Sequence, residues 1–180
     1  IMKKTFLLFI LALCSIALFA QNEDWLWAKK AGGTDYDNGY SITVDDNGNS
    51  YVTGVFEGSA TFGTTTLTSS GSDDIFVAKM DINGNWLWAK KAGGTSYDYG
   101  LGITVDANGN SYVTGYFMNS ATFGTTTLTS SGSYDIFVAK LDNNGNWLWA
   151  KKAGGTSDDF GYGIAVDVYG NSYVTGYFYS

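Results

Sequence analysis

Two segments of this sequence, 45–49 and 106–110, carry side chains with oxygen atoms at alternate positions. This spacing is found in half of a calcium-binding loop. A third segment, 167–171, has Tyr169 where a ligand would stand, and no glutamate follows at the distance that a complete loop requires. Asn-Gly in the first two segments favours the positive φ angles of a tight hairpin turn. We therefore predict hairpin turns and keep calcium binding as the alternative. The candidate ligands are Asp45, Asn47, Asn49, Asp106, Asn108 and Asn110.

Acidic and aromatic residues gather in three loops bounded by glycines, at 33–39, 94–100 and 155–161. Aromatic rings beside carboxylates can bind sugars, which makes these loops a candidate ligand rim. The alternative, which we favour, is a connection between structural units in which the acid accepts hydrogen bonds from backbone N–H groups. The residues of the candidate rim are Tyr36, Asp37, Tyr97, Asp98, Asp159 and Phe160.

The residue types of many catalytic sites are missing from this chain. It has no histidine and no arginine, and Cys14 is its single cysteine, which excludes Ser-His-Asp triads, Cys-His pairs and histidine metal sites. Adjacent acids remain at 73–74 and 158–159, and glycosidase chemistry needs two carboxylates. Neighbouring residues of a strand point to opposite faces, however, and the residue 61 positions after Asp73 is Tyr134. We predict that these acids are solvated turn residues and that the protein is not an enzyme and needs no cofactor.

These segments belong to a repeat with a period of 61 residues, in units 25–85, 86–146 and 147–180. The first two units are identical at 50 of 61 positions. A repeat of this length is typical of stacked architectures, in which each unit buries its faces against its neighbours.

Short runs of β-branched and aromatic residues, separated by Asn-Gly turns, predict strands throughout one unit. In the second unit these are 86–91, 102–106, 111–117 and 135–141, with a small extra hairpin or an extended loop at 121–129. Strict alternation places Trp86, Trp88 and Lys90 on one face. Four antiparallel strands per repeat are the blades of a β-propeller, with small residues such as Gly102 on the inner strand and the indoles in the wide outer gap. We predict an all-β fold with about two and a half blades, an incomplete ring in which 25–33 is the outer strand of a further blade.

Two phrases of the second unit, 102–115 and 135–142, resemble the bacterial β-propeller repeat called SBBP. The resemblance extends over nearly all of residues 25–180. It implies a propeller in an exported bacterial protein, and it implies no catalytic residues because structural repeats define the family.

The first 20 residues have the layout of a secretory signal peptide. Lys3 and Lys4 precede an apolar run that ends at Ala20, the predicted cleavage point. The run is shorter than a membrane-spanning helix, so we predict no membrane span after signal removal. Cys14 leaves a lipoprotein anchor as the alternative. The repeat region is then 21–180, and the incomplete ring indicates the N-terminal piece of a longer protein.

The net charge of −7, without any arginine, excludes nucleic acid as a partner. The sequence therefore predicts a non-enzymatic, secreted or cell-surface propeller that serves as a scaffold or protein-interaction module. The alternatives are a carbohydrate-binding, lectin-like propeller and the propeller part of a larger exported enzyme. The expected partners are a protein or glycan at the cell surface, and further blades supplied by additional sequence or by self-association.

Overall fold

The computed structural model describes residues 26–179, which form ten β-strands and no helix. The predicted all-β class is confirmed, whereas the predicted signal peptide, 1–20, lies outside the described residues. Within the described part, no helix has the length and hydrophobicity to span a bilayer. The strands are β1 (Asp37–Val44), β2 (Ser50–Phe62), β3 (Thr65–Met80), β4 (Trp86–Gly94), β5 (Asp98–Val105), β6 (Ser111–Phe123), β7 (Thr126–Leu141), β8 (Trp147–Ala153), β9 (Asp159–Val166) and β10 (Ser172–Phe178).

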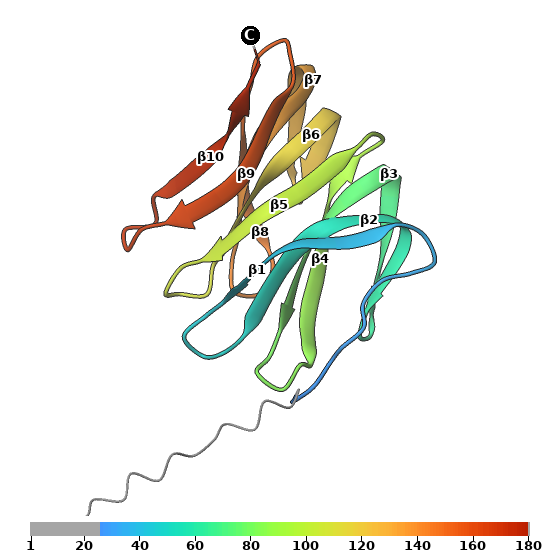
Figure 1. The fold of residues 1–180 in the computed structure, drawn as a ribbon, viewed down its shortest axis with the longest axis vertical. Coiled ribbons are helices and arrows are strands. Elements are labelled where there is room, and N and C mark those ends of the chain that lie inside the picture. Colours follow the sequence, from blue (N-terminus) through green and yellow to red (C-terminus); the bar gives the residue numbers. More distant parts are fainter. Residues whose placement is uncertain (1–25, 180) are drawn as a thin grey trace, which may run out of the picture.

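The strands form two complete four-stranded blades and half of a third. Strands β1 to β4 pair in order as an antiparallel meander, β5 to β8 repeat it, and β9 pairs with β10. Figure 1 shows β1, β5 and β9 side by side, each leading its own blade. The stack does not close into a ring, so the predicted incomplete propeller is confirmed.

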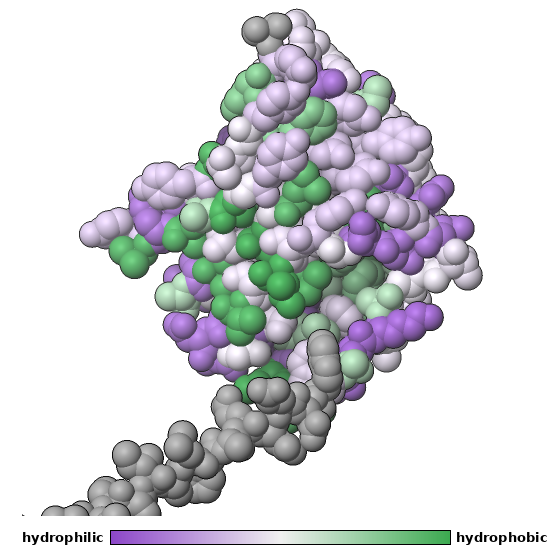
Figure 2. All heavy atoms as spheres, in the orientation of Figure 1, coloured by the Kyte–Doolittle hydropathy of each residue, from purple (hydrophilic) through white to green (hydrophobic). Residues whose placement is uncertain are grey.

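The inner strands approach one another closely, as predicted for the narrow side of a propeller. A Cβ atom added to Gly102 of β5 would lie 2.9 Å from the carbonyl oxygen of Tyr162 in β9. Only glycine therefore fits here without a shift of backbone. Figure 2 shows hydrophobic side chains gathered over these inner strands, where Ile42 and Val44 of β1 are 63% and 56% exposed.

The extra hairpin expected at 121–129 is instead the outer end of β6 and β7. Ser120 pairs with Thr129, but the next pair is Met118 with Tyr134, so residues 130–133 bulge out of the ladder. The first blade has the same irregularity between Glu57 and Ser59. The hairpin formed by the two middle strands of a blade, such as β6 and β7, is therefore long enough to reach the last strand of the preceding blade. Gly93 and Gly94 of β4 pair with Thr122 and Ala121 of β6.

The main hydrophobic core lies between the first two blades. It joins residues of β2, β3 and β4, such as Tyr51 and Ile75, to residues of β5 to β8, such as Phe117 and Phe137. A second cluster, which includes Phe56 and Phe76, covers the other face of the first blade. The blades are thus held together mainly by buried apolar side chains, the dominant favourable contribution to folding.

The prediction that Trp86 and Trp88 share a face is wrong. Met80 pairs with Trp86 while its neighbour Lys79 pairs with Trp88, so Leu87 is an extra residue in β4. A bulge of this kind reverses the alternation of side chains on one side of it. Trp86 consequently packs on the second cluster, which includes Phe56 and Phe76, whereas Trp88 packs on the main core between the blades. The prediction that the indoles fill gaps between blades holds for Trp88 and Trp147.

The segment before β1 occupies the place expected for an outer strand of a further blade. Gly32 forms a bridge with Thr61, as Gly93 does with Thr122 one repeat later. The indole Nε1 of Trp27 donates a hydrogen bond to the carbonyl of Ile82 at 3.2 Å, which matches the bond from Trp88 to Asn143. Apart from this single bridge, residues 26–36 are not paired as a strand.

Candidate functional site

At one end of the blades lie the turns with calcium-like spacing, and the first aspartate of each turn accepts hydrogen bonds from backbone N–H groups of the same turn. Asp45 Oδ1 accepts hydrogen bonds from the backbone N–H groups of Asn47 and Asn49, at 3.0 and 2.9 Å. Its Oδ2 accepts from the Asn49 side chain and from the Tyr51 hydroxyl, at 2.8 and 3.1 Å. Although burial would raise the pKa of Asp45, these hydrogen bonds hold it below the usual value. Residues 45–49 form the predicted hairpin turn between β1 and β2, and the Asp45 carboxylate accepts hydrogen bonds within it.

Turns of the same kind begin at Asp81, Asp106, Asp142 and Asp167. In the last one, Tyr169 donates its backbone N–H to Asp167 at 2.9 Å, as asparagine does elsewhere. The position requires only a backbone donor, which explains why tyrosine can replace a would-be ligand there. Among the described residues, no three acids, cysteines or histidines are grouped so that they could hold a metal ion.

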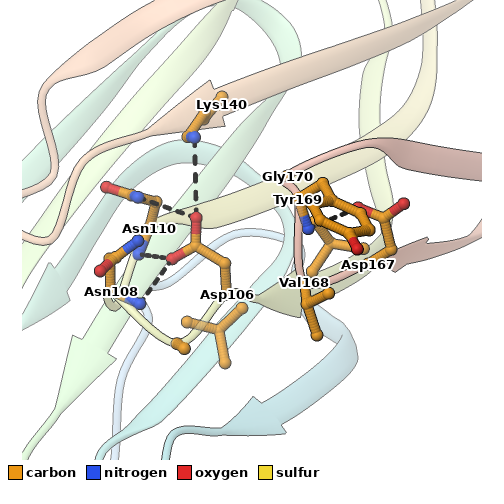
Figure 3. Close-up of a pocket in the computed structure, with 11 residues that line it drawn as sticks. Asp106, Asn108, Asn110, Lys140, Asp167, Val168, Tyr169 and Gly170 are labelled. Atoms are coloured by element: carbon orange, nitrogen blue, oxygen red, sulfur yellow. Dashed lines mark hydrogen bonds and ion pairs between the residues drawn. The ribbon is translucent and has the colours of Figure 1, made fainter.

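Two of these turns enclose an open pocket of about 300 Å³ (Figure 3). Asp106, Asn110 and Lys140 line one side, and the turn 167–170 lines the other. One repeat earlier, the corresponding place holds Asn143, whose Oδ1 accepts hydrogen bonds from Tyr51 and from Lys79. The pocket therefore corresponds to the space that the turn containing Asn143 fills one repeat earlier. We interpret it as a stacking position and not as a ligand site.

At the opposite end, the three acids of the candidate rim hold the backbone together. Asp98 is fully buried, and its two oxygens accept hydrogen bonds from the N–H groups of Gly94 and Met118, at 2.7 and 3.3 Å. Asp159 binds Gly155 in the same way, and Asp37 binds Gly33 at 2.5 Å. The favoured interpretation, an acid that satisfies backbone donors, is confirmed. These carboxylates tie each connecting loop to the blade that follows.

Burial raises the pKa of the Asp98 carboxyl well above its usual value. Removal from water raises its pKa to about 7, and the nearby charge of Asp74 adds to the effect, while the two backbone hydrogen bonds oppose it. A Cβ atom placed on Gly93 would lie 2.6 Å from Asp74 Oδ1 and 3.0 Å from Asp98 Oδ2. Both carboxylates thus lie against the side of this glycine where a side chain would begin.

The prediction that Asp73 and Asp74 are solvated turn residues is wrong. They are 7% and 0% exposed, because β3 runs through both positions. Asp74 Oδ2 accepts a hydrogen bond from the N–H of Ser70 at 2.9 Å and lies 3.8 Å from the Lys91 ammonium. Asp73 accepts a hydrogen bond from the Tyr99 hydroxyl. The prediction is also wrong for Asp159, which is fully buried at the start of β9, whereas Asp158 lies half-buried in the loop before that strand.

Beside these acids, aromatic side chains from all three blades form a continuous cluster that we call the aromatic face. Tyr99 and Tyr116 stack with ring centroids 4.9 Å apart, and Tyr40 lies 6.2 Å from Tyr99. Phe160 meets Tyr116 edge-on at 4.7 Å. The aromatic face consists of Tyr40, Tyr99, Tyr116, Tyr134, Phe160, Tyr162, Tyr177 and Tyr179.

The inner rings of the aromatic face are partly buried, and the outer ones are exposed to solvent. Tyr99 and Tyr116 are partly buried, and burial, the largest cause, raises the pKa of both hydroxyls above the usual value. Tyr162 and Tyr179 are 55% and 57% exposed. A supported row of rings with open outer surfaces is suited to binding, because ordering it costs little further conformational entropy.

The first two repeat units differ mostly at this end of the blades. Seven of the eleven differences lie at this end. They fall in the loop before the first strand of a blade, at the start of that strand, or near the irregularity in the β2–β3 and β6–β7 hairpins. Tyr99, Tyr116 and Tyr134 of the aromatic face replace Asn38, Val55 and Asp73 of the first unit. The seven pairs are 35/96, 38/99, 40/101, 55/116, 57/118, 58/119 and 73/134.

Three predicted rim residues lie in or beside the aromatic face. Phe160 is part of it, the Tyr36 hydroxyl lies 3.2 Å from that of Tyr40, and Tyr97 is exposed in the loop before β5. Sequence reasoning missed the other members, such as Tyr116 and Tyr177. The differences between copies of the repeat were the signal that could have found them.

Comparisons with known proteins agree with this architecture. The family of SBBP β-propeller repeats matches residues 26–55, 87–116 and 148–177. An uncharacterised WD repeat-containing protein of Acanthamoeba polyphaga mimivirus is 30% identical over 190 residues, which covers 85% of this chain and 13% of the relative. The regulatory protein FlaEY of Caulobacter vibrioides is 28% identical over 110 residues, 59% of this chain and 12% of the relative. The chain therefore spans about one eighth of the length of these curated relatives. Each matched copy begins in an outer strand, or in the segment that takes its place before β1, and continues into the first two strands of the next blade. The chain belongs to the family of SBBP β-propeller repeat proteins.

Proposed function

We propose that this chain is a non-enzymatic, exported propeller scaffold that binds a protein partner through its aromatic face. The observation that carries the proposal is the concentration of differences between near-identical repeats at this one end. Positions that stack blades must keep their residue types, whereas positions that meet a partner are free to diverge. Seven of the eleven differences lie at the end of the blades that carries the aromatic face.

The chemistry of the aromatic face supports a protein partner. Tyrosine supplies large, rigid contact area at low entropic cost, and serine, glycine and asparagine supply adaptable hydrogen bonds in binding loops. The face and its loops combine these types, with Tyr97, Ser96 and Asn119 beside the stacked rings. Aromatic residues and methionine, here Met118, are also enriched at the centres of protein interfaces.

Export is the second part of the proposal, and it rests on residues 1–20. A charged start followed by a short apolar run and a small residue is the signal-peptide pattern. An epitope-tagged full chain should be degraded by protease added to intact cells or recovered from the medium. A chain that stays protected until the cells are lysed would contradict export.

Site-specific photo-crosslinking tests the binding surface. A photoreactive phenylalanine replaces Tyr97 beside the aromatic face or, as the matched control, Tyr169 in the turn at the opposite end, where the side chain is 88% exposed. We expect a discrete crosslinked protein from position 97 and none from position 169. Equal yields at both positions, or a crosslink only at 169, would overturn the assignment. Retention by neutral oligosaccharides on a glycan array, lost in Tyr97→Ala, would favour the lectin alternative instead.

A further inference from the structure

We propose that the aromatic face recognises a cationic segment of its partner, with lysine or arginine side chains seated on the exposed tyrosine rings; this inference rests on the function proposed above. Two independent features converge on it: ring surfaces that are open to solvent, and negative charge placed directly beside them. Cations are attracted to the electron-rich faces of aromatic rings.

The exposed ring surfaces come from the first and the third blades. Tyr40 of the first blade is 40% exposed, and Tyr162 and Tyr177 of the third are 55% and 38% exposed. Phe160 stacks on both of these at centroid distances of 6.4 and 5.7 Å, which fixes their orientation. Several rings are therefore held ready before a ligand arrives, so that more than one cationic side chain can be bound at once.

The negative charge beside the rings comes from carboxylates on three elements. Asp73 on β3 accepts the hydrogen bond of Tyr99, which stacks on Tyr116, and an anion at the hydroxyl makes the ring system more attractive to a cation. Glu57 pairs with Asp73 across the β2–β3 ladder and is exposed. Asp158 lies in the loop before β9, where its backbone carbonyl accepts a hydrogen bond from the N–H of Tyr179.

The ionisation of the tyrosines agrees with a negative field at this surface. After burial, the charge of Asp158 is the next cause that raises the pKa of Tyr134, and Asp73 contributes as well. Asp158 also helps to raise the pKa of Tyr177 to about 12, where a hydrogen bond with Tyr179 is the main cause. Lys91 and Lys152 pair with the buried Asp74 and Asp135, so their positive charges are compensated. A cationic partner fits this field, whereas an anionic one would be repelled.

Titration of the purified full chain with a peptide of alternating lysine and glycine tests the inference. The control peptide has the same sequence with every lysine acetylated, which removes the charge and keeps the length. We expect the lysine peptide to bind, binding to weaken as salt is raised, and the acetylated peptide to bind about tenfold more weakly or not at all. Equal binding of both peptides, or no binding of the lysine peptide at low salt, would overturn the proposal.

Two exposed tyrosines provide the matched variants. Tyr162→Leu removes a ring of the aromatic face and should weaken peptide binding roughly two- to fivefold, the size of one exposed cation–π contact. Tyr169→Leu, at the opposite end and 88% exposed, should leave binding unchanged. Equal losses in the two variants would contradict the assignment. If position 97 still crosslinks a protein while the lysine peptide does not bind, this inference fails and the proposed function stands. Binding of a neutral oligosaccharide in place of the peptide would refute both.

Discussion

The indoles of Trp86 and Trp88 pack against opposite faces of the first blade, although a single residue separates them in β4. Leu87 is the extra residue of the bulge and is 52% exposed. Because it has no partner in β3, the two indoles on either side of it point to opposite faces. The same bulge recurs at Leu148 in β8. As a result, the interface between the two complete blades receives Trp88 from one and Trp147 from the other.

Removing one of these indoles should destabilise the stack. Trp147 meets Phe123 edge-on at 5.3 Å and donates a hydrogen bond to the carbonyl of Lys91 at 3.2 Å. We expect Trp147→Ala to lower the free energy of unfolding by about 2–4 kcal/mol, measured by urea denaturation with circular dichroism. Leu148→Ala, one residue away and exposed, should stay within about 0.5 kcal/mol. Similar losses in the two variants would show that the indole does not hold the blades together.

The buried carboxylate of Asp98 predicts an inverted pH dependence. Its pKa is about 7 in the folded state and about 3.9 in an unfolded chain, so the folded state binds the additional proton between these values. Stability from this group is therefore complete below about pH 4 and is lost as the pH rises through 7. We expect the melting temperature to fall between about pH 4 and pH 7 and to level off above this range.

The variant Asp98→Asn isolates this effect. An amide cannot ionise, so the fall with rising pH should largely disappear, while a constant cost remains at every pH because one backbone N–H loses its acceptor. Asp45 and Asp106 have lowered pKa values, and their contribution is lost only in stronger acid. An unchanged slope between about pH 4 and pH 7 in the variant would assign the dependence to another group.

Calcium should not stabilise this protein. In each Asp-x-Asn-Gly-Asn turn, the aspartate already accepts hydrogen bonds from the turn, as Asp106 does from Asn108 and from Asn110 at 2.9 Å. A ligand that binds only the folded state raises the melting temperature, so we expect no shift with millimolar calcium. A clear upward shift that is lost in Asp106→Ala would restore the calcium interpretation.

The described chain leaves an open blade face at each end, which predicts self-association. Ile42 is 63% exposed, whereas Ile103, its counterpart one repeat later, is 6% exposed between blades. Tyr173 is 59% exposed, and its counterpart Tyr112 is fully buried. Surfaces that complement each other within the stack can also meet between copies. Sedimentation should show mass increasing with concentration, and the double variant Ile42→Lys with Tyr173→Lys should shift the chain toward monomer. A monomer at all concentrations without these substitutions would contradict the prediction.

Much of the blade architecture follows from local sequence. The turns between paired strands carry Asn-Gly, Tyr-Gly or Gly-Thr, and Gly109 has a positive φ of 76°, as tight turns require. Because the repeat carries these turns at a fixed period, strand order and the incomplete third blade could be predicted. The faces of Trp86 and Trp88 could not, since a bulge depends on the register with β3 and strict alternation does not reveal it.

The aromatic face depends on contacts between repeats, which strand prediction does not supply. Tyr99 and Phe160 occupy the same position in consecutive units, and Tyr40 lies two residues after that position in the first unit. Only the stacking of β1, β5 and β9 brings these rings together. The acids in the same loops looked like ligand groups in sequence. Asp98 and Asp159 are instead buried, because each loop has backbone donors that no strand satisfies.

Nuclear magnetic resonance of the chain with isotope-labelled tyrosine tests most directly whether the aromatic face is the binding surface. Tyrosines occur at both ends of the blades, with Tyr40, Tyr116 and Tyr162 on the aromatic face and Tyr51, Tyr112 and Tyr169 near the turns. Addition of the lysine-glycine peptide should move the ring signals of the first group and leave those of the second in place. Shifts confined to the second group, or spread equally over both, would contradict the assignment of the aromatic face as the binding surface.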